Sequence, residues 1–300
     1  MSKLPLSVIT AVLNEEKNLP QFLKYASSIA EEIIIVVDYR NSDNSADIAK
    51  KHGARVIQDR GESAGIVFNN KNKGAHEAKY DWIMILDADE RMEETLIKEL
   101  NAIVTGEKKT SAVMFQTGFI NYEFGKFFEK CDQKNKTFIR LFRKGEFEYK
   151  TGETAEGLGI ETQGVIARIP ILRSLVRNAD PRIRTLRGKL IHNSHPTIHD
   201  FVRKIDHYSD REARILFKNN RHPNLFALGF KLVLLPHKEF VYKYFVWRMY
   251  LEGTHGFIAS ALYAFYSFLI WSRYFTLVYH QSHKKEIKKI LREVGFTPDV

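Results

Sequence analysis

Short apolar runs alternate with segments of helical periodicity over the first hundred residues, and this alternation constrains the fold more than any other feature. Residues 6–13, 32–37 and 82–86 are almost wholly apolar, which is typical of parallel strands buried on both faces. Between the first two runs, residues 14–30 place apolar side chains at helical spacing. The alternation predicts an α/β fold built on a doubly wound parallel sheet. The other elements expected in this part are helices at 45–52, 69–79 and 93–104 and a strand at 54–58.

The character of the chain changes twice after this part. Residues 111–190 alternate short apolar pieces with glycine-containing turns, which predicts an antiparallel or mixed half of the sheet. Residues 191–300 are helical, aromatic and basic in character. There, Thr197 and Asp200 have the spacing of a capping box and precede an expected apolar stripe. The expected stripe consists of Ile198, Phe201, Val202, Ile205 and Tyr208.

Carboxylates follow two of the predicted strands at the point where each strand ends. Asp38 comes directly after residues 32–37, and Asp87 and Asp89 follow residues 82–86. Ligands of open α/β sheets bind outside the carboxyl ends of the strands. Two carboxylates one residue apart can reach one hard cation such as Mg²⁺ or Mn²⁺, although an isolated Asp-x-Asp is more often an acidic turn. Asp38 is expected to accept a hydrogen bond from a nucleobase or a ribose.

Lys71 and Asn72 lie in a polar helical segment between these two strand ends. A cation and an amide beside a small residue suit a diphosphate group. An exposed basic turn would have the same composition, so these two residues alone leave both interpretations open.

The charge balance points to an anionic partner. The formal net charge is +10, and many of the Lys and Arg residues after residue 189 alternate with aromatic residues, which suits a membrane surface better than a nucleic acid. A solvated basic face without a partner is the alternative. The single cysteine, Cys131, allows no intramolecular disulfide and fits a reducing compartment.

No segment of the sequence is expected to cross a membrane. The longest uncharged run, residues 256–271, is shorter than the roughly 20 residues that a spanning helix needs. The N-terminal apolar stretch is followed at once by Asn14, Glu15 and Glu16, so we do not expect a signal peptide. The C-terminal region is instead expected to lie on a membrane surface, through apolar segments at 226–235 and 257–271. The basic residues around them are Lys231, His237, Lys238, Lys243, Arg248 and Arg273.

Blocks in a fixed order along the chain resemble the family 2 glycosyltransferases, and in particular their lipopolysaccharide-core glucosyltransferase-like branch. The signature Leu-Asp-Ala-Asp-Glu of that branch stands here at residues 86–90. Tyr39 and Arg40 depart from the small residues usual after the first aspartate. The matching blocks are residues 6–10 with 14–16, Asp38, 71–72, 82–91, 140–143, 190–192 and 250–253 with Gly256.

The resemblance implies an A-type glycosyltransferase fold, with a single Rossmann-like nucleotide-binding sheet and a C-terminal helical extension. It also implies a nucleoside-diphosphate sugar donor, a divalent metal and inversion at the anomeric carbon. Residues 1–190 would form the catalytic domain, with a nucleotide-sugar half at 1–110 and an acceptor half at 111–190, and residues 191–300 would follow as the helical region. By this resemblance the donor is held by Thr10, Asn14, Glu15, Asp38, Lys71, Asn72 and Asp87, and the metal by Asp89.

The catalytic base is assigned by the same resemblance. The branch carries a His-Glu pair after the block at 140–143, and the matching stretch here is residues 152–157. Ala155 replaces the histidine, so Glu156 is the candidate base, with Glu153 as the alternative. His192 belongs to a block of the branch and is expected to be structural or to lie on the acceptor side, not to bind zinc.

The sequence therefore predicts a glycosyltransferase, most simply a hexosyltransferase, that modifies a cell-envelope glycan or a lipid-linked acceptor. It is expected to be cytoplasmic and peripheral on the inner face of the membrane. A nucleotidyltransferase on a similar sheet is a second hypothesis, although Asn14 and Glu15 follow the first strand where a triphosphate-binding loop would be needed. A non-catalytic membrane-surface scaffold is the third, since the histidine beside Glu156 is missing.

Overall fold

A computed structural model describes residues 2–62, 67–132, 136–149, 181–219 and 224–294. The chain divides into two compact units. The first unit consists of residues 1–123, 127–129 and 133–194, and the second of residues 124–126, 130–132 and 195–300. The division of the chain into functional domains at residue 190 stays a prediction.

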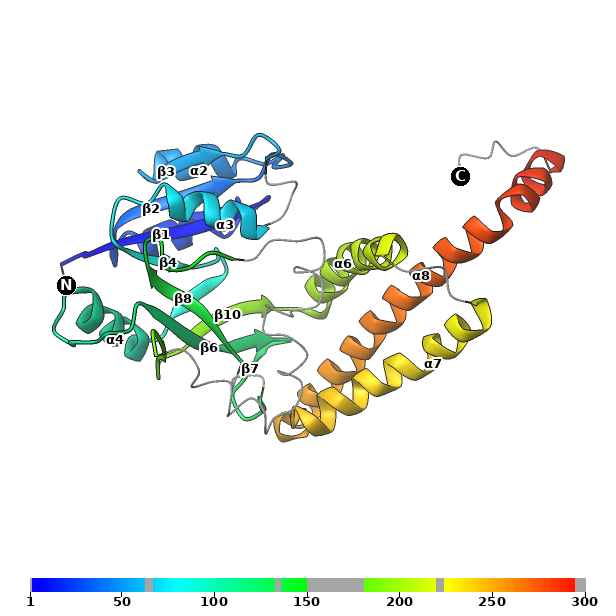
Figure 1. Cartoon of the computed structure of the whole chain (residues 1–300). Coiled ribbons are helices and arrows are strands. Elements are labelled where there is room, and N and C mark those ends of the chain that lie inside the picture. The colour runs from blue at the N-terminus through cyan, green and yellow to red at the C-terminus, as the bar shows by residue number, and fades with distance from the viewer. Residues whose placement is uncertain (1, 63–66, 133–135, 150–180, 220–223, 295–300) are drawn as a thin grey trace. The chain divides into compact units, whose positions relative to one another are not determined.

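The described strands of the first unit form one sheet in which β1 (Leu4–Val12) is central (Figure 1). β1 pairs in parallel with β2 (Ala30–Val37) on one side and with β4 (Trp82–Ile85) on the other. β3 (Arg55–Gln58) extends the parallel part beyond β2. The strand order begins β3-β2-β1-β4. It continues with β8 (Thr137–Arg143), β6 (Met114–Glu123), β10 (Leu190–His195) and β5 (Glu90–Met92). The parallel sheet expected from the apolar runs is thus present.

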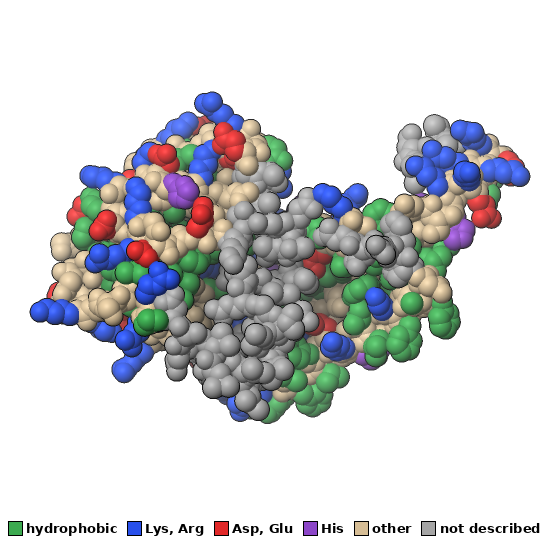
Figure 2. Space-filling model, viewed as in Figure 1, with side chains coloured by type: hydrophobic (Ala, Val, Ile, Leu, Met, Phe, Trp, Pro, Cys, Tyr) green, Lys and Arg blue, Asp and Glu red, His purple; other side chains and the backbone are tan. Residues whose placement is uncertain are grey.

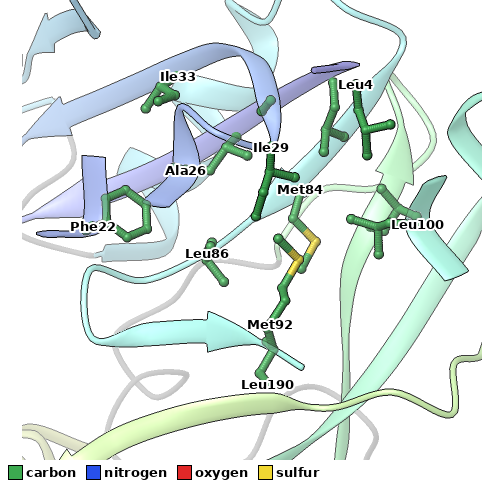
Figure 3. Packing of buried hydrophobic residues seen from close by; sticks show 14 of the residues in the cluster. Leu4, Phe22, Ala26, Ile29, Ile33, Met84, Leu86, Met92, Leu100 and Leu190 are labelled. Carbon is green, nitrogen blue, oxygen red and sulfur yellow. The ribbon is translucent and has the colours of Figure 1, made fainter. Parts of the chain in front are cut away.

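The apolar runs are continuous because the parallel strands are buried on both faces. Alternate residues enter two different clusters: Val8 and Ile35 lie in one, and Ile9 and Ile34 in the other. The first cluster also receives Phe22 and Ala26 of α1, and Figure 3 shows these with residues from the neighbouring strands. The helices of this part are α1 (Leu19–Ala26), α2 (Ser45–Lys51), α3 (Val67–His76) and α4 (Glu94–Val104).

Gly74 lets helix α3 lie directly on the sheet. A Cβ atom at this position would come within 2.4 Å of Cγ2 of Ile9, and within 3.0 Å of Cγ2 of Val36. Both contacts are with stiff β-branched side chains of the sheet, which cannot turn away freely. The glycine is therefore required by the close approach of α3 to β1 and β2.

The second half of the sheet is mixed, as the glycine-punctuated pattern predicts. β8 (Thr137–Arg143) pairs antiparallel with β4 and with β6 (Met114–Glu123), while β9 (Ile183–Thr185) runs parallel to β6. The sequence did not predict β5 (Glu90–Met92), which directly follows the Asp87 to Asp89 segment and pairs antiparallel with β10. β10 spans Leu190–His195 and β7 spans Lys126–Phe128.

The second unit is helical. Its helices are α6 (Ile198–Asn219), α7 (Leu225–Val241), the π-helical η3 (Tyr242–Val246), the 3₁₀ η4 (Met249–Glu252) and α8 (Thr254–Glu293). Among the helices that the structure describes, none is both long enough and apolar enough to span a membrane.

The start of α6 agrees with the predicted cap, but its buried face does not agree with the predicted stripe. The backbone N–H of Asp200 donates to Oγ1 of Thr197, and the Thr197 hydroxyl donates to the Asp200 carboxylate. Phe201 and Ile205 are buried as expected. In contrast, Ile198, Val202 and Tyr208 are exposed, and the buried face continues through Ser209, Glu212 and Ala213. Apolar character alone did not reveal this face because two of its members are polar.

The block at residues 250–256 has a structural explanation. The buried carboxylate of Glu252 accepts hydrogen bonds from the backbone N–H groups of Lys130 and Cys131 and pairs with Nζ of Lys126 at 2.9 Å. Gly253 has a φ of 67°, and a Cβ at Gly256 would lie 1.8 Å from the carbonyl oxygen of Met249. The glutamate and both glycines therefore fix the turn between η4 and α8.

A buried carboxyl group makes the stability of the second unit depend on pH. Glu212 of α6 accepts a hydrogen bond from the hydroxyl of Tyr266 on α8. Burial raises the pKa of Glu212 to about 7, and it outweighs Tyr266 and Arg211, which favour the ionised form. Between roughly pH 4.5 and 7 the folded chain therefore holds a proton that the unfolded chain has released.

We predict that the free energy of unfolding falls as the pH rises through this window, by on the order of 3 kcal/mol for this one group. Urea titrations at pH 5 and pH 8 measure the difference. Glu212→Gln removes the titration and should flatten the profile, whereas Glu239→Gln on α7 serves as a partly exposed control. An unchanged profile in Glu212→Gln would show that Glu212 is ionised in the folded chain.

Candidate active site at the carboxyl edge of the sheet

Thr10 joins two strands beneath the edge where the parallel strands end. Its side chain is fully buried, and its hydroxyl donates to the carbonyl oxygen of Leu86 at 2.8 Å. The backbone N–H of Leu86 donates in turn to the carbonyl oxygen of Ile9. Thr10 thus fixes the start of the segment that carries Asp87, and its predicted contact with a nucleoside stays a prediction.

Asn14 and Glu15 lie in a loop that is hydrogen-bonded to the loop after β2. Oδ1 of Asn14 accepts from the N–H of Ser42, and the N–H of Asn14 donates to Oδ1 of Asn41, both at 2.8 Å. The N–H of Glu15 donates to the hydroxyl of Ser45 at 2.9 Å. Asn14 has a φ of 59°, a left-handed conformation that asparagine tolerates. These bonds bring both predicted residues next to the chain that follows Asp38.

Asp38 ends β2 as predicted, and its carboxylate is already occupied. Oδ1 accepts from the backbone N–H and from Nε of Arg40, at 3.0 and 2.8 Å. Oδ2 accepts from Nη2 of Arg40 at 3.0 Å and from Nδ2 of Asn70 at 3.4 Å. Burial opposes ionisation, but the hydrogen bonds and the charge of Arg40 outweigh it and lower the pKa of Asp38. The carboxylate is therefore held ionised.

Asp87 lies between two cations. Nζ of Lys71 is 2.8 Å from Oδ1, and Nη1 of Arg140 is 3.6 Å from Oδ2. Burial opposes ionisation of Asp87, but Lys71 and Arg140 hold its pKa well below the usual range. The structure thus brings Lys71 and Asp87 together, as two neighbouring members of the predicted donor site.

Glu90 completes a chain of alternating charges behind Asp87. Oε1 of Glu90 is 2.8 Å from Nη2 of Arg140, and Oε2 accepts from the backbone N–H of Asp87. Burial raises the pKa of Glu90, although Arg140 acts in the opposite direction. Glu90 therefore holds both the arginine and the backbone of the strand-end segment in position.

Asp89 faces a different partner. Its Oδ2 lies 3.4 Å from Nε2 of His192, and Nδ1 of His192 lies 3.1 Å from Oδ1 of Asn121. The backbone N–H of Asn193 donates to the carbonyl oxygen of Asp89. The two aspartates of the Asp-Ala-Asp segment thus have separate surroundings, one cationic and one with a histidine.

Asn72 is directed away from this cluster. Its amide donates to the carbonyl oxygen of Tyr149 and accepts from the N–H of Tyr149, both at 2.9 Å. Lys71 and Asn72 are neighbours on α3 but serve different contacts, and the predicted donor contact of Asn72 stays a prediction. Glu156 and Glu153 lie outside the described residues.

Sequence reasoning did not assign Arg140, Glu90 or Asn121 to the site, and it expected His192 to be structural or to lie on the acceptor side. Arg140 carried one signal, since it is a cation between Phe138 and Phe142 in a predicted strand. Its proximity to Asp87 depends on the pairing of β8 with β4, which joins segments that are far apart in the sequence.

The chain is similar to known glycosyltransferases. Residues 7–155 match the family model "Glycosyl transferase family 2". An uncharacterized glycosyltransferase of Rickettsia typhi is 28% identical over 279 residues, covering 90% of this chain and 85% of the relative. The lipopolysaccharide core biosynthesis glycosyltransferase LpsC of Rhizobium meliloti is 24% identical over 268 residues, covering 88% and 90%.

Solved structures were also compared with the chain. Staphylococcus aureus TarS 1–349 in complex with UDP has a TM-score of 0.46 at 15% identity, covering 94% of this chain and 92% of that one. Mycobacterium tuberculosis glucosyl-3-phosphoglycerate synthase in complex with Mn²⁺ and UDP-glucose has a TM-score of 0.29 at 18% identity, covering 38% and 43%. The family match, taken with the mixed sheet and the C-terminal helices, confirms the predicted α/β class and A-type fold.

Proposed function

The chain carries a family 2 glycosyltransferase domain and is a glycosyltransferase, and we propose that it transfers a sugar, with inversion, from a nucleoside diphosphate to a cell-envelope glycan or a lipid-linked acceptor. The observation that carries the proposal is the array of charged groups at the carboxyl edge of the parallel sheet. Asp87 is paired with Lys71 and Asp89 with His192. Asp38 follows β2, and Asp87 and Asp89 follow β4, on the two sides of β1. This is where open α/β sheets bind nucleotides.

The charges of this array suit the parts of a nucleotide sugar. Asp38, with the loop of Asn14 and Glu15 beside it, would accept hydrogen bonds from the nucleoside. Lys71 would contact the diphosphate or the donor sugar, because its ammonium lies beside the strand-end carboxylates. Asp87, kept ionised by two cations, would hold the ribose. The chemistry of LpsC, a lipopolysaccharide core glycosyltransferase by name, supports an envelope acceptor.

The donor atoms at Asp89 fit a divalent cation. Nδ1 of His192 lies 3.1 Å from Oδ1 of Asn121, to which it can donate, and in the neutral imidazole this would leave the lone pair of Nε2, 3.4 Å from the Asp89 carboxylate, for a metal. Such an orienting second partner is typical of histidines that bind metals. Asp87 is already neutralised by Lys71 and Arg140, which leaves Asp89 as the carboxylate ligand.

Among the described residues, no group of three or more His, Cys, Asp or Glu side chains could hold a metal ion. The proposed ligands are therefore Asp89 and His192, with the donor's phosphates and water completing the shell, as Mg²⁺ and Mn²⁺ prefer. When bound, the ion would offset the negative charge that develops on the diphosphate leaving group.

The proposed base is Glu156, which would take the proton of the acceptor hydroxyl as that oxygen attacks the anomeric carbon. Tyr149, seven positions earlier, is pinned to α3 through both of its backbone hydrogen bonds with Asn72. The described chain before the proposed base therefore ends beside the helix that carries Lys71.

We propose further that the second unit docks on an anionic membrane surface. Phe226, Phe230 and Val233 on α7 are 85%, 64% and 64% exposed, and their spacing places them on one face of the helix. Figure 2 shows hydrophobic side chains gathered on this part of the surface, with Lys and Arg among them. Aromatic side chains favour the headgroup boundary, and each nearby basic residue adds about 1 kcal/mol at an anionic leaflet.

Two of the basic residues expected to face the membrane are engaged within the unit. Lys243 is buried, with Nζ 3.6 Å from the centre of the Trp247 ring and 4.4 Å from that of Tyr263. The guanidinium of Arg273 donates to the backbone carbonyl oxygen of Asp206 and also to the Asp206 carboxylate. Lys231 is half-buried, with Nζ 5.2 Å from the centre of the Trp271 ring. The membrane contribution would therefore come mainly from Lys238 and the other exposed cations.

We predict that Asp89→Asn abolishes transfer and weakens Mn²⁺ binding, and that His192→Ala weakens Mn²⁺ binding by at least roughly 10-fold, since losing a ligand costs no less than losing the group that orients it. Calorimetric titration with Mn²⁺ in the presence of UDP measures the affinity directly, apart from turnover. Asp47→Asn, on an exposed helical position, is the control. Full activity of Asp89→Asn in the presence of a chelator would exclude the metal role.

For the base, we expect Glu156→Gln to lower turnover by roughly 10²-fold or more while the affinity for the donor stays the same, because the amide keeps the volume and loses the basicity. Single-turnover rates and donor titrations separate the two quantities. If Glu153→Gln produces this pattern and Glu156→Gln does not, the base is Glu153.

For the membrane, we expect sedimentation with liposomes to increase with the fraction of anionic lipid and to decrease with salt. Replacing Phe226 and Phe230 by serine should abolish it, whereas the same replacement at the exposed α6 residues Val202 and Tyr208 should not. Full-length chain that stays in the supernatant with acidic liposomes at low salt would remove membrane docking from the proposal.

A further inference from the structure

Arg40 occupies the carboxylate that the donor's nucleoside would use. We infer that Arg40 is a displaceable competitor for the nucleoside and thereby sets the affinity and base preference for the donor. The inference rests on the proposed donor site at Asp38. The inference goes beyond that site because family 2 glycosyltransferases usually carry small residues at the position of Arg40.

The first step is that Asp38 has no acceptor position left. A carboxylate offers about four lone-pair sites, two on each oxygen. Oδ1 takes the backbone N–H and Nε of Arg40, and Oδ2 takes Nη2 of Arg40 and Nδ2 of Asn70. An N–H or O–H group of an incoming nucleoside can therefore bind Asp38 only by replacing one of these donors.

The second step is that the guanidinium is the donor that can leave. The backbone N–H of Arg40 is fixed by the turn after β2, in which Asn41 also donates to the carbonyl oxygen of Asp38. Asn70 is buried, and its Oδ1 already has no hydrogen-bond partner among the described residues. Releasing its Nδ2 from Asp38 would leave a second buried polar group of this side chain without a partner. The Arg40 side chain is 42% exposed, against 6% for Asp38, and it can return to solvent.

The third step concerns the group that must replace the guanidinium at Asp38. Once the guanidinium leaves, the buried carboxylate loses a bidentate, charge-assisted pair, which is among the stronger polar interactions in proteins. An imide N–H of the base or a ribose hydroxyl can restore a hydrogen bond, whereas a base edge that carries only acceptors cannot. The wild-type affinity is accordingly reduced by the fraction of chains in which Arg40 covers Asp38. Arg40 thus lowers the affinity for nucleosides with a donor at this position and narrows the preference among bases.

The experiment is a calorimetric titration of the full-length chain with UDP, whose base has an imide N–H, and with CDP, whose base has an acceptor nitrogen at the same ring position. We expect Arg40→Ala and Arg40→Gln to bind UDP roughly 5- to 20-fold more tightly than the wild type. Arg40→Lys keeps the charge but cannot form the bidentate pair, so its affinity for UDP should lie between that of the wild type and that of Arg40→Ala. The preference for UDP over CDP should be larger in Arg40→Ala, because only the imide N–H of UDP gains a hydrogen bond when Asp38 is uncovered.

Arg55→Ala is the matched control. Arg55 is also a half-exposed arginine paired with carboxylates, those of Glu77 and Glu32, but it begins β3 at the opposite edge of the sheet. Its removal should leave UDP binding unchanged. Weaker or unchanged UDP binding in both Arg40→Ala and Arg40→Gln would overturn the inference, because Arg40 would then assist the ligand or not meet it.

The same titrations with Asp38→Asn distinguish the proposed donor site at Asp38 from the competitor role of Arg40. If Asp38→Asn weakens UDP binding but the Arg40 variants do not tighten it, the donor site stands and the competitor role of Arg40 is wrong. If Asp38→Asn has no effect in either the wild-type or the Arg40→Ala background, the nucleoside does not meet this carboxylate, and both assignments are wrong. In the expected case, Asp38→Asn removes the gain produced by Arg40→Ala.

Discussion

Burial of the parallel strands on both faces is the constraint from which the arrangement of this molecule follows. A sheet with apolar side chains on each side has no place for ionised groups except at its ends, because an unpaired charge in the core would be costly. Asp38 and the Asp87 to Asp89 segment take that place. Even there, each buried carboxylate needs cationic or N–H partners, which Arg40, Lys71 and Arg140 provide. The same packing that builds the core therefore concentrates paired charges where a phosphorylated substrate can meet them.

Local periodicity was sufficient to predict the parallel strands and the helices of the first hundred residues and the carboxylates that follow β2 and β4, but not the short strand β5. Strand β2 and helix α2 lie within two residues of their expected bounds, since both are defined by near neighbours in the sequence. The expected helix at 14–30 is shorter, because residues 14–18 form a loop held by side chains of the chain after β2. That loop depends on contacts that no local pattern contains.

The partners of the site were less predictable, and the reason is distance along the chain. Arg140 reaches Asp87 through the β4–β8 pairing, and His192 reaches Asp89 through the β5–β10 pairing. The sequence shows that an arginine and a histidine exist in these blocks, but not which carboxylate each one meets. Arg40 was visible as a departure from the family pattern, yet only the structure shows that it forms a fork with the residue two positions before it.

The close approach of α3 to the sheet has a consequence for how such chains can diverge. Gly74 and Lys71 lie one turn apart on the same face of α3, so the distance of the helix from β1 also sets how far the lysine must reach to Asp87. A lineage that gained a side chain at position 74 would lift the helix and lengthen the lysine–aspartate gap. A side chain at position 74 therefore requires either smaller residues at positions 9 and 36, or a change at position 71 or 87 that restores the ion pair. Gly74 makes no polar contact itself, but the residues that can replace it are limited by the Lys71–Asp87 ion pair.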